Sequence, residues 1–295
     1  MSPDHLDLGG AHLRRITDLD RFALPLSLLF PEARQQELEP FRADLAPWHY
    51  DFDAGAVLLG VHSLLLRLDG LTVLIDTCVG ACKPRPARPE WHARKAQGYL
   101  AALAAAGLGP EDIDMVFCTH LHADHVGWNT RLQDGRWVPT FPRARYVMGR
   151  AEHDHWQKAE AQAPGQHNHG AYADSVLPVV AAGQADLVED GADLHHGLTV
   201  LPLPGHSPGQ TGLALDLQGR RVVFCGDAIH SPLQIFRPDW SSRFCHDPDQ
   251  ARRTRRALLE QAVAEDLALI PAHLRGALGL RVRGHGGGFR PAPLF

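Results

Sequence analysis

The chain has 295 residues, 44% of them hydrophobic, which is enough for one large domain or two small ones with a sizeable core. Its formal net charge of −5 and its pI near 6.4 give no general attraction to nucleic acid or acidic membranes, and favour a small-molecule substrate. No apolar run approaches the roughly 18 residues of a membrane span, and the N-terminus lacks the regions of a signal peptide. We therefore expect a cytoplasmic protein without nucleic-acid or membrane partners.

Residues 1–50 contain scattered prolines and aromatic residues, and this pattern predicts an irregular arm that packs on the body or on a partner subunit. A homodimer is considered on that ground. Residues 51–295 form the expected catalytic domain. Five cysteines are an odd number with uneven spacing, so free thiols are expected. Cys78 and Cys82 form a CxxxC pair, which we interpret as two packed or partly exposed thiols rather than a structural zinc site.

Apolar runs separated by turn residues predict a strand-rich domain. The predicted strands are 57–68, 71–76, 115–118, 144–148, 198–203, 212–216, 221–225 and 267–272. A helical pattern that includes Ala96 covers 89–106, and a second helix, capped by Asp247, covers 247–265. The arginines of this second helix are interpreted as a solvated face. They are Arg252, Arg253, Arg255 and Arg256.

The segment Cys118–Gly127 carries four potential metal ligands directly after an apolar strand. They are His120, His122, Asp124 and His125. Zinc accepts imidazole and carboxylate ligands, and α/β sheets place their ligand sites at the carboxyl ends of strands. His120 and His122 point the same way if extended geometry continues, whereas the other two follow the turn, so two neighbouring metals are supplied more easily than one. We interpret the segment as a metal site rather than a histidine-rich surface loop.

Three further candidate ligands follow later strands. His206 lies in the turn Gly205–Gly209, Asp227 follows the strand that ends at Cys225, and His273 follows the last apolar strand. Each alone has an ordinary explanation as a turn residue, a helix cap or a core histidine. Together with the four residues above they suffice for two metals that share a bridging carboxylate.

The order HxHxDH, Gly-His, Asp and a final His resembles the metallo-β-lactamase superfamily of metallohydrolases, from about Val57 to the C-terminus. The resemblance implies an α/β fold, an αββα sandwich in which two mixed β-sheets lie face to face with helices outside. The implied ligands of the first metal are His120, His122 and His206. The implied ligands of the second metal are Asp124, His125 and His273, with Asp227 as the bridge.

The surrounding residues resemble the branch that contains N-acyl-homoserine lactonases and methyl parathion hydrolase. The segments that carry this likeness include Asp76–Gly80, Gly226–His230 and Asp247–Asp249. The best-known lactonases have a Tyr three residues after the bridging Asp, where this chain has His230, as on the phosphotriesterase side. True β-lactamases usually lack the bridging Asp, so Asp227 argues against β-lactam hydrolysis.

We expect two divalent ions, zinc before manganese, cobalt or iron, to lower the pKa of a shared water from about 15.7 toward about 7. The bridging hydroxide would attack a lactone or carboxylic ester of a small, fairly apolar substrate. Asp124 would orient the hydroxide and pass a proton to the leaving group, and His230 would donate a hydrogen bond to the tetrahedral intermediate. Cys225 could face the same site, but it is interpreted as a buried strand thiol.

Phosphotriester hydrolysis at the same residues is an alternative, and an iron-dependent persulfide dioxygenase is an alternative from another class. Flavin-linked di-iron proteins generally have Glu where this chain has His122 and add a flavin domain. RNA-processing nucleases also add a domain, and a serine hydrolase would need a GxSxG elbow, which the sequence lacks. A non-catalytic binding module is the weakest alternative because no ligand is missing.

Three segments are expected to form the pocket walls, namely 82–91, 150–183 and 230–244. The polar, histidine-rich segment 150–183 is predicted to form one or two helices over the site. Its histidines are interpreted as surface residues rather than ligands. They are His153, His155, His167 and His169. An apolar pocket is expected from Trp91, Trp156, Ile229, Leu233, Ile235, Phe236 and Trp240.

Overall fold

The computed structural model describes residues 4–95, 98–217 and 219–294. The chain divides into two compact units. Unit 1 comprises Met1–Asp4, Leu19–Gly60 and Asp193–Phe295, and unit 2 comprises His5–Asp18 and Val61–Ala192. In the part of the chain that the structure describes, no helix is long and apolar enough to cross a membrane.

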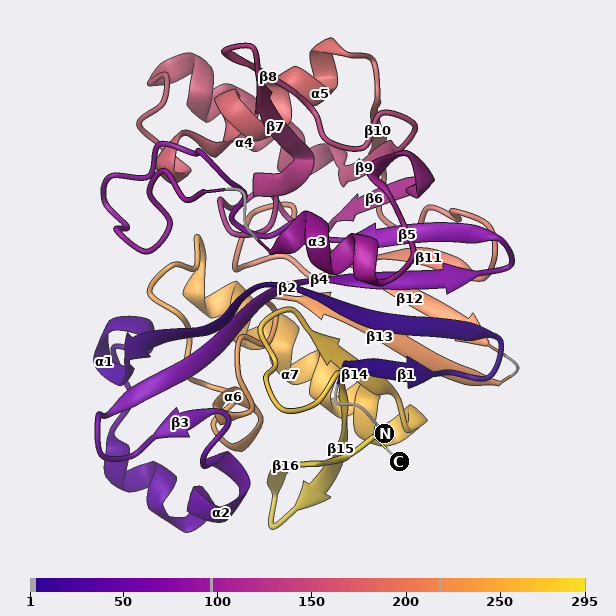
Figure 1. Cartoon of the computed structure of the whole chain (residues 1–295). Helices are drawn as coiled ribbons and strands as arrows, with labels where there is room; N and C mark the ends of the chain where they lie inside the picture. The colour runs from indigo at the N-terminus through magenta and orange to yellow at the C-terminus, as the bar shows by residue number, and fades with distance from the viewer. Residues whose placement is uncertain (1–3, 96–97, 218, 295) are drawn as a thin grey trace. The chain divides into compact units, whose positions relative to one another are not determined.

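Unit 2 is built on a mixed β-sheet with the strand order β1-β2-β4-β5-β6-β9-β10 (Figure 1). Its strands are β1 (His5–Asp7), β2 (Ala11–Pro25), β4 (Ala56–Leu68), β5 (Leu71–Ile75), β6 (Met115–Cys118), β9 (Arg145–Gly149) and β10 (Ala185–Val188). Strands β5, β6, β9 and β10 pair in parallel, whereas β1 with β2 and β4 with β5 pair antiparallel. Strands β2 and β4 continue into unit 1, where β3 (Tyr50–Asp51) pairs with β4.

Local sequence explains the centre of this sheet. Strand β4 is apolar along almost its whole length, and all its residues except Arg67 are buried. Asp69 and Gly70 both have positive φ, 49° and 78°, which is the geometry of a two-residue hairpin between β4 and β5. Strand β6 is fully buried between two parallel neighbours, so its carboxyl end delivers the next residues to one edge of the sheet.

The α-helices of unit 2 are α3 (Tyr99–Ala105), α4 (Arg150–Gln162) and α5 (Leu177–Ala181). The π-helix η5 (Tyr172–Val176) and the 3₁₀ helices η2 (Pro110–Asp112), η3 (Gly127–Asn129) and η4 (Asn168–Gly170) also belong to this unit. Strands β7 (Thr130–Gln133) and β8 (Arg136–Pro139) form a separate hairpin. The prediction that segment 150–183 forms helices is therefore confirmed. The predicted start of the first helix at 89 is wrong, because α3 begins only after Gly98, whose φ is 108°. Ala96 of that prediction lies outside the described residues.

Unit 1 is built on a six-stranded mixed sheet in the order β11-β12-β13-β14-β15-β16. Its strands are β11 (Leu198–Pro202), β12 (Thr211–Leu217), β13 (Arg220–Gly226), β14 (Ala268–Pro271), β15 (Leu280–His285) and β16 (Gly288–Pro293). Strands β13 and β14 pair in parallel and the other neighbours pair antiparallel. Helix α7 (Pro248–Glu265) packs Leu258, Leu259 and Ala262 against core residues of these strands.

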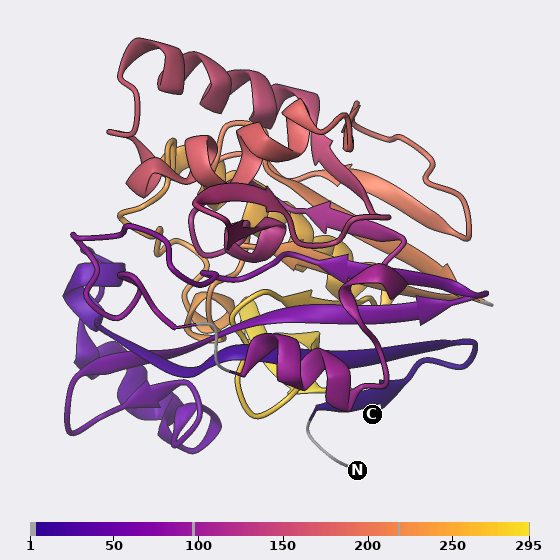
Figure 2. The same cartoon turned by 45° about the horizontal axis from the view of Figure 1, so that its top comes forward.

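The predicted irregular structure of residues 1–50 is wrong for residues 4–50, and residues 1–3 lie outside the described part of the chain. Most of the first half of this segment is strand, and Figures 1 and 2 show β2 running beside β4. Leu13 and Ile16 of β2 are completely buried, which explains why the strand forms although its sequence is rich in charge. The rest of the segment forms α1 (Leu26–Leu29), the 3₁₀ helix η1 (Gln35–Phe41) and α2 (Arg42–Leu45).

Helix α7 begins as predicted, but one of its arginines is not solvated. The Asp247 side chain accepts hydrogen bonds from the backbone of Asp249 and Gln250. Arg255 is completely buried and donates to the carbonyl oxygens of Ala228, Pro238 and Trp240. It lies on the helix face that carries Leu258 and Leu259, and a basic residue on that face must find buried acceptors.

Candidate metal centre

His120 and His122 lie directly after β6, and their ring nitrogens face each other. His120 Nε2 is 3.0 Å from His122 Nδ1. The Thr119 hydroxyl donates to Asp76 Oδ2 at 2.9 Å and so accepts at 3.0 Å from His120 Nδ1. This assigns the proton of a neutral His120 to Nδ1 and leaves the lone pair on Nε2. The 3.0 Å contact between the two rings confirms the prediction that His120 and His122 point the same way.

Asp124 and His125 follow the turn of the same loop. His125 is buried, and its Nδ1 lies 2.9 Å from Asp76 Oδ2, a carboxylate oxygen that can only accept. The lone pair of the neutral ring is then on Nε2, which lies 3.9 Å from Asp124 Oδ1. Asp124 keeps 20% of its side chain exposed, so its carboxylate can meet both an ion and solvent.

Unit 1 holds a second cluster, centred on Asp227. Its Oδ2 lies 3.3 Å from His206 Nε2 and 3.2 Å from His230 Nε2. Its Oδ1 lies 3.2 Å from His273 Nε2. All four side chains are at most 5% exposed. The two oxygens of one buried carboxylate therefore face different histidines.

The local backbone explains how these residues meet. The register of β13 with β14 shifts between Phe224 and Gly226, and such an irregularity redirects the residue that follows, here Asp227. His273 follows β14 and places its Nδ1 2.8 Å from the carbonyl oxygen of Gly60, which can only accept, so the Nε2 lone pair is directed toward Asp227. Asp227 and His273, both candidate ligands, lie at the ends of strands as predicted.

A family model described as "Metallo-beta-lactamase superfamily" matches residues 56–273 of the chain. The chain belongs to this superfamily. Among the solved structures of similar fold, the hydrolase AbOPH in the beta lactamase superfamily has a TM-score of 0.81 and 23% identity, with 99% of this chain and 97% of that chain covered. AidC, a dizinc quorum-quenching lactonase, has a TM-score of 0.80 and 22% identity, with 98% and 96% covered. The predicted metallo-β-lactamase fold is confirmed.

Curated relatives of this superfamily member have slightly higher sequence identity over shorter alignments. The N-acyl homoserine lactonase AiiB of Agrobacterium fabrum is 26% identical over 235 residues, which cover 73% of this chain and 79% of that protein. A probable metallo-hydrolase of Mycobacterium tuberculosis is 25% identical over 191 residues, which cover 60% of this chain and 59% of that protein. The chain thus matches little more than half the length of the mycobacterial protein.

The donor set of this superfamily member fits divalent ions of the size of zinc. Two ligand atoms of a tetrahedral site with Zn–N distances of 2.0–2.1 Å lie about 3.3 Å apart. The measured separations, 3.0 Å within the His120 pair and 3.2–3.3 Å around Asp227, are close to that value. His206, Asp227 and His230 form one group whose ligand atoms all lie within 4.8 Å of one another.

His230 is itself a member of the Asp227 cluster, a contact that the sequence did not predict. Its ring centroid is 4.6 Å from that of His206, and its backbone amide donates to Gln234 Oε1 at 2.7 Å. Gln234 in turn donates to the carbonyl oxygen of Trp240 at 2.9 Å. Helix α6 (Leu233–Phe236) therefore fixes the backbone at His230, and the side chain can act on Asp227 directly.

The four histidines of segment 150–183 do not belong to any group of potential metal ligands in the described residues. Among residues 4–95, 98–217 and 219–294, no group of potential ligands includes them or the pair Cys78 and Cys82. His153 is buried rather than on the surface, and its Nε2 lies 3.1 Å from the hydroxyl of Tyr172, so its surface prediction is wrong. All five cysteines are free thiols, as predicted. Burial raises the pKa of Cys225, which keeps it a neutral thiol inside the strand.

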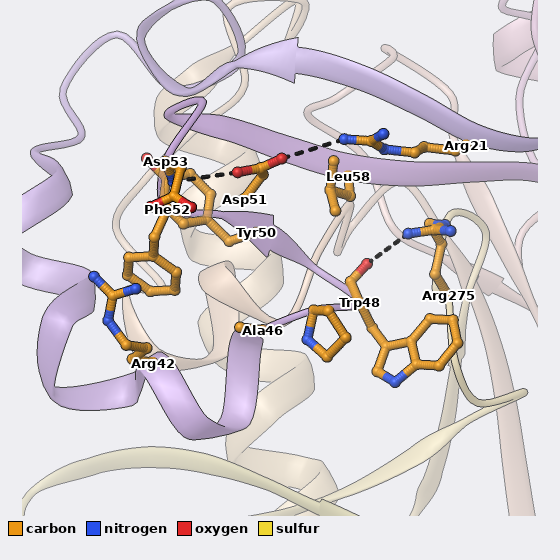
Figure 3. A pocket seen from close by; sticks show the side chains of 11 residues that line it. Arg21, Arg42, Ala46, Trp48, Tyr50, Asp51, Phe52, Asp53, Leu58 and Arg275 are labelled. Atoms are coloured by element: carbon orange, nitrogen blue, oxygen red, sulfur yellow. Dashed lines mark hydrogen bonds and ion pairs between the residues drawn. The ribbon is translucent and has the colours of Figure 1, made fainter.

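Three of the residues expected to line an apolar pocket lie in the core. Ile229, which precedes α6, and Leu233 and Ile235 of α6 are completely buried and belong to the core. A surface pocket of about 450 Å³ lies elsewhere in unit 1 and is lined by Trp48, Tyr50, Arg275 and their neighbours (Figure 3). None of the predicted ligands lines it. The arginines that line it are each paired with a carboxylate, Arg21 with Asp51, Arg42 with Glu39 and Arg275 with Asp20.

Proposed function

We propose that the chain is a dinuclear metal-dependent hydrolase that cleaves a lactone or carboxylic ester of a small, fairly apolar substrate. One observation carries the proposal. The buried carboxylate of Asp227 presents one oxygen to His206 and His230 and the other to His273. A carboxylate that bridges two ions needs this arrangement, in which each oxygen shares an ion with a different histidine.

The proposed ligands follow from the two clusters and from membership of the superfamily. The first ion would be held by His120, His122 and His206. The second ion would be held by Asp124, His125 and His273, with Asp227 as the bridge. The contacts within each unit support this assignment, because the paired nitrogens of His120 and His122 suit one ion and the Nε2 lone pair of His125 faces Asp124. Zinc is proposed first, since imidazole and carboxylate suit it, and manganese, cobalt or iron could replace it.

Two bound divalent ions would supply an activated water at neutral pH and polarise the substrate carbonyl. The side chains of this chain have separate tasks. Asp124, the most exposed of the proposed carboxylate ligands, would orient the attacking water and carry a proton to the leaving group. His230, whose Nε2 lies 3.2 Å from Asp227 Oδ2, would donate its N–H to the oxyanion that develops on the substrate.

The substrate class is proposed from the relatives. AiiB is named an N-acyl homoserine lactonase and AidC a dizinc quorum-quenching lactonase, and both names describe lactone hydrolysis. Phosphotriester hydrolysis at the same residues is the second candidate, because a histidine at 230 can donate to a phosphoryl oxygen as well as to a carbonyl oxygen.

A metal-resolved substrate panel tests the proposal. Purified full-length protein loaded with zinc, manganese or cobalt would be assayed on lactones, carboxylic esters, phosphotriesters, thioesters and β-lactams. We expect two ions per chain and the highest kcat/KM on a lactone or ester. The strongest turnover on phosphotriesters would select the second candidate, and iron with oxygen uptake on a persulfide would overturn the hydrolase.

Two ligand variants and one control complete this test. His120→Ala and Asp227→Ala should lose metal and activity together, whereas the exposed His195→Ala should keep both. Full turnover by both ligand variants would contradict the two-metal scheme. A cytoplasmic location and a homodimer stay predictions, and a monomeric mass by light scattering would remove the latter.

A further inference from the structure

The segment 119–126, which follows β6 and is called the metal-binding loop below, has its backbone held by two side chains from outside the loop. The Leu121 amide, between His120 and His122, donates to Glu152 Oε1 at 3.0 Å. The Leu121 carbonyl oxygen accepts from Asn168 Nδ2 at 2.6 Å, and the Ala123 amide donates to Asn168 Oδ1 at 2.9 Å. Asn168 therefore forms hydrogen bonds with the peptide groups on both sides of His122.

The orientation of the Asn168 amide is fixed by chemistry. A carbonyl oxygen can only accept and a backbone N–H can only donate, so the NH₂ group must face Leu121 and the oxygen must face Ala123. This is the pattern with which a neighbouring strand would pair. An aspartate of the same shape would direct an oxygen at the Leu121 carbonyl, and two acceptors would then face each other.

The backbone around Asn168 is in an uncommon conformation. Asn168, His169 and Gly170 have φ of 48°, 56° and 76°, and the left-handed region is unfavourable for residues other than glycine. The completely buried Arg85 stabilises this turn, because it donates to the His169 carbonyl oxygen at 2.8 Å and forms two hydrogen bonds with Asp174. Backbone strain of this kind persists where the surroundings fix it, and it is concentrated at functional sites.

Glu152 acts on the same peptide from helix α4. It is 1% exposed, and its Oε1 also accepts from Trp156 Nε1 at 2.7 Å. The Trp156 ring lies edge-on to His122, with centroids 5.5 Å apart. The acceptor that holds Leu121 therefore also holds the aromatic ring that packs on His122.

We propose that Asn168, with Glu152, is a positioning residue that fixes the direction of His122 relative to His120, so that the two nitrogens 3.0 Å apart can share one ion. The proposal rests on the proposed function of these histidines as ligands. A rotation of either peptide beside His122 would turn its ring away, while the fold around the loop would persist. The residue should therefore determine metal affinity and geometry more than stability.

Two variants of Asn168 separate the side chain from the backbone. Asn168→Gly keeps the left-handed turn without strain and removes only the side chain. Asn168→Asp keeps the shape and replaces the donor by an acceptor. The matched control is Asp134→Gly, an exposed residue at φ 50° in the β7–β8 turn, outside the metal-binding loop.

The readouts are the affinity of the full chain for Co²⁺, measured by competition with a chelator, and the d–d absorption spectrum of bound Co²⁺. Loss of a residue that orients a ligand typically costs 10–100-fold in metal affinity. We expect about a 10-fold loss for Asn168→Gly, about a 100-fold loss for Asn168→Asp, and an altered spectrum in both. Asp134→Gly should match the wild type, and the thermal midpoints of the metal-free Asn168 variants should stay close to it.

Each outcome decides between the two ideas. Wild-type affinity and spectrum in folded Asn168→Gly and Asn168→Asp would overturn the positioning role and leave the proposed function intact. A lower thermal midpoint with unchanged affinity would assign Asn168 a purely structural role and overturn it as well. A wild-type chain that binds no Co²⁺ would overturn the proposed function itself.

Discussion

The carboxylate of Asp76 orients His125: Oδ2 accepts from the Nδ1–H of the imidazole at 2.9 Å. The same carboxylate accepts from the backbone amide of Thr119 at 2.8 Å and from its hydroxyl at 2.9 Å. Asp76 therefore joins the end of β5 to the end of β6 and sets the tautomer of a proposed ligand. All three donors depend on an acceptor-only side chain.

Asp76→Asn tests this relationship. The amide would direct a donor at one of the groups that already donate to Asp76, so either Thr119 loses its partner or His125 must move its proton to Nε2, the nitrogen proposed to bind metal. We expect a 10–100-fold loss of metal affinity, measured by chelator competition, and less than two ions per chain by elemental analysis.

Asp114→Asn is the matched control. Asp114 also accepts a backbone hydrogen bond within unit 2, from Thr72 at 2.9 Å, but it lies before β6 and outside the metal-binding loop. It should keep wild-type affinity. If Asp76→Asn binds metal within about twofold of the wild type, the orienting role of Asp76 is wrong.

Much of this site could be predicted because short stretches of sequence mark its strands and the residues that follow them. Apolar runs such as 115–118 and 267–272 mark buried strands, and the residues after them inherit the position of the strand end. His120, Asp227 and His273 were identified in this way. Asp76 follows the strand β5 by the same logic, so its role could have been found from its place after Ile75.

Other features depend on contacts that the sequence does not encode locally. Arg255 has the composition of a solvated helix face, and only its carbonyl partners from residues 228–240 explain its burial. Strand β2 is too charged to be distinguished from an irregular arm without its neighbour β4. Asn168 meets Leu121 across 47 positions, and no spacing rule predicts that pair.

Gly205→Ala tests whether the close approach of the turn before His206 to helix α7 affects the free energy of unfolding. Gly205 has φ of +126°, and a Cβ there would lie 2.3 Å from the backbone nitrogen and 2.6 Å from the Cα of Ala251. Helix backbone cannot move aside cheaply, so strain and overpacking together should cost about 3 kcal/mol or more of unfolding free energy. Urea unfolding of the metal-free chain measures this loss.

Gly287→Ala separates the two causes. Gly287 also has positive φ, +78°, but nothing lies within 4 Å of the position of its Cβ. It should show only the smaller cost of the left-handed conformation, about 1 kcal/mol. Equal losses in the two variants would mean that the approach to Ala251 has no energetic effect.

His49 should make the chain less stable in mild acid. Burial, and then repulsion by Arg275, lowers the pKa of His49 from 6.5 to about 4. Between these values the unfolded chain binds a proton that the folded chain does not, so the free energy of unfolding falls as the pH drops from about 6.5 to about 4 and this contribution then levels off. For one histidine the full effect is at most about 3 kcal/mol, and partial exposure reduces it.

His49→Gln removes this proton-binding site. Urea unfolding at pH 7 and pH 4.5 should show a smaller loss of stability in the variant than in the wild type, by about 1–2 kcal/mol. His195→Gln, at an exposed position of the same unit, should lose as much as the wild type. An unchanged acid response in His49→Gln would show that this half-buried imidazole does not couple folding to pH.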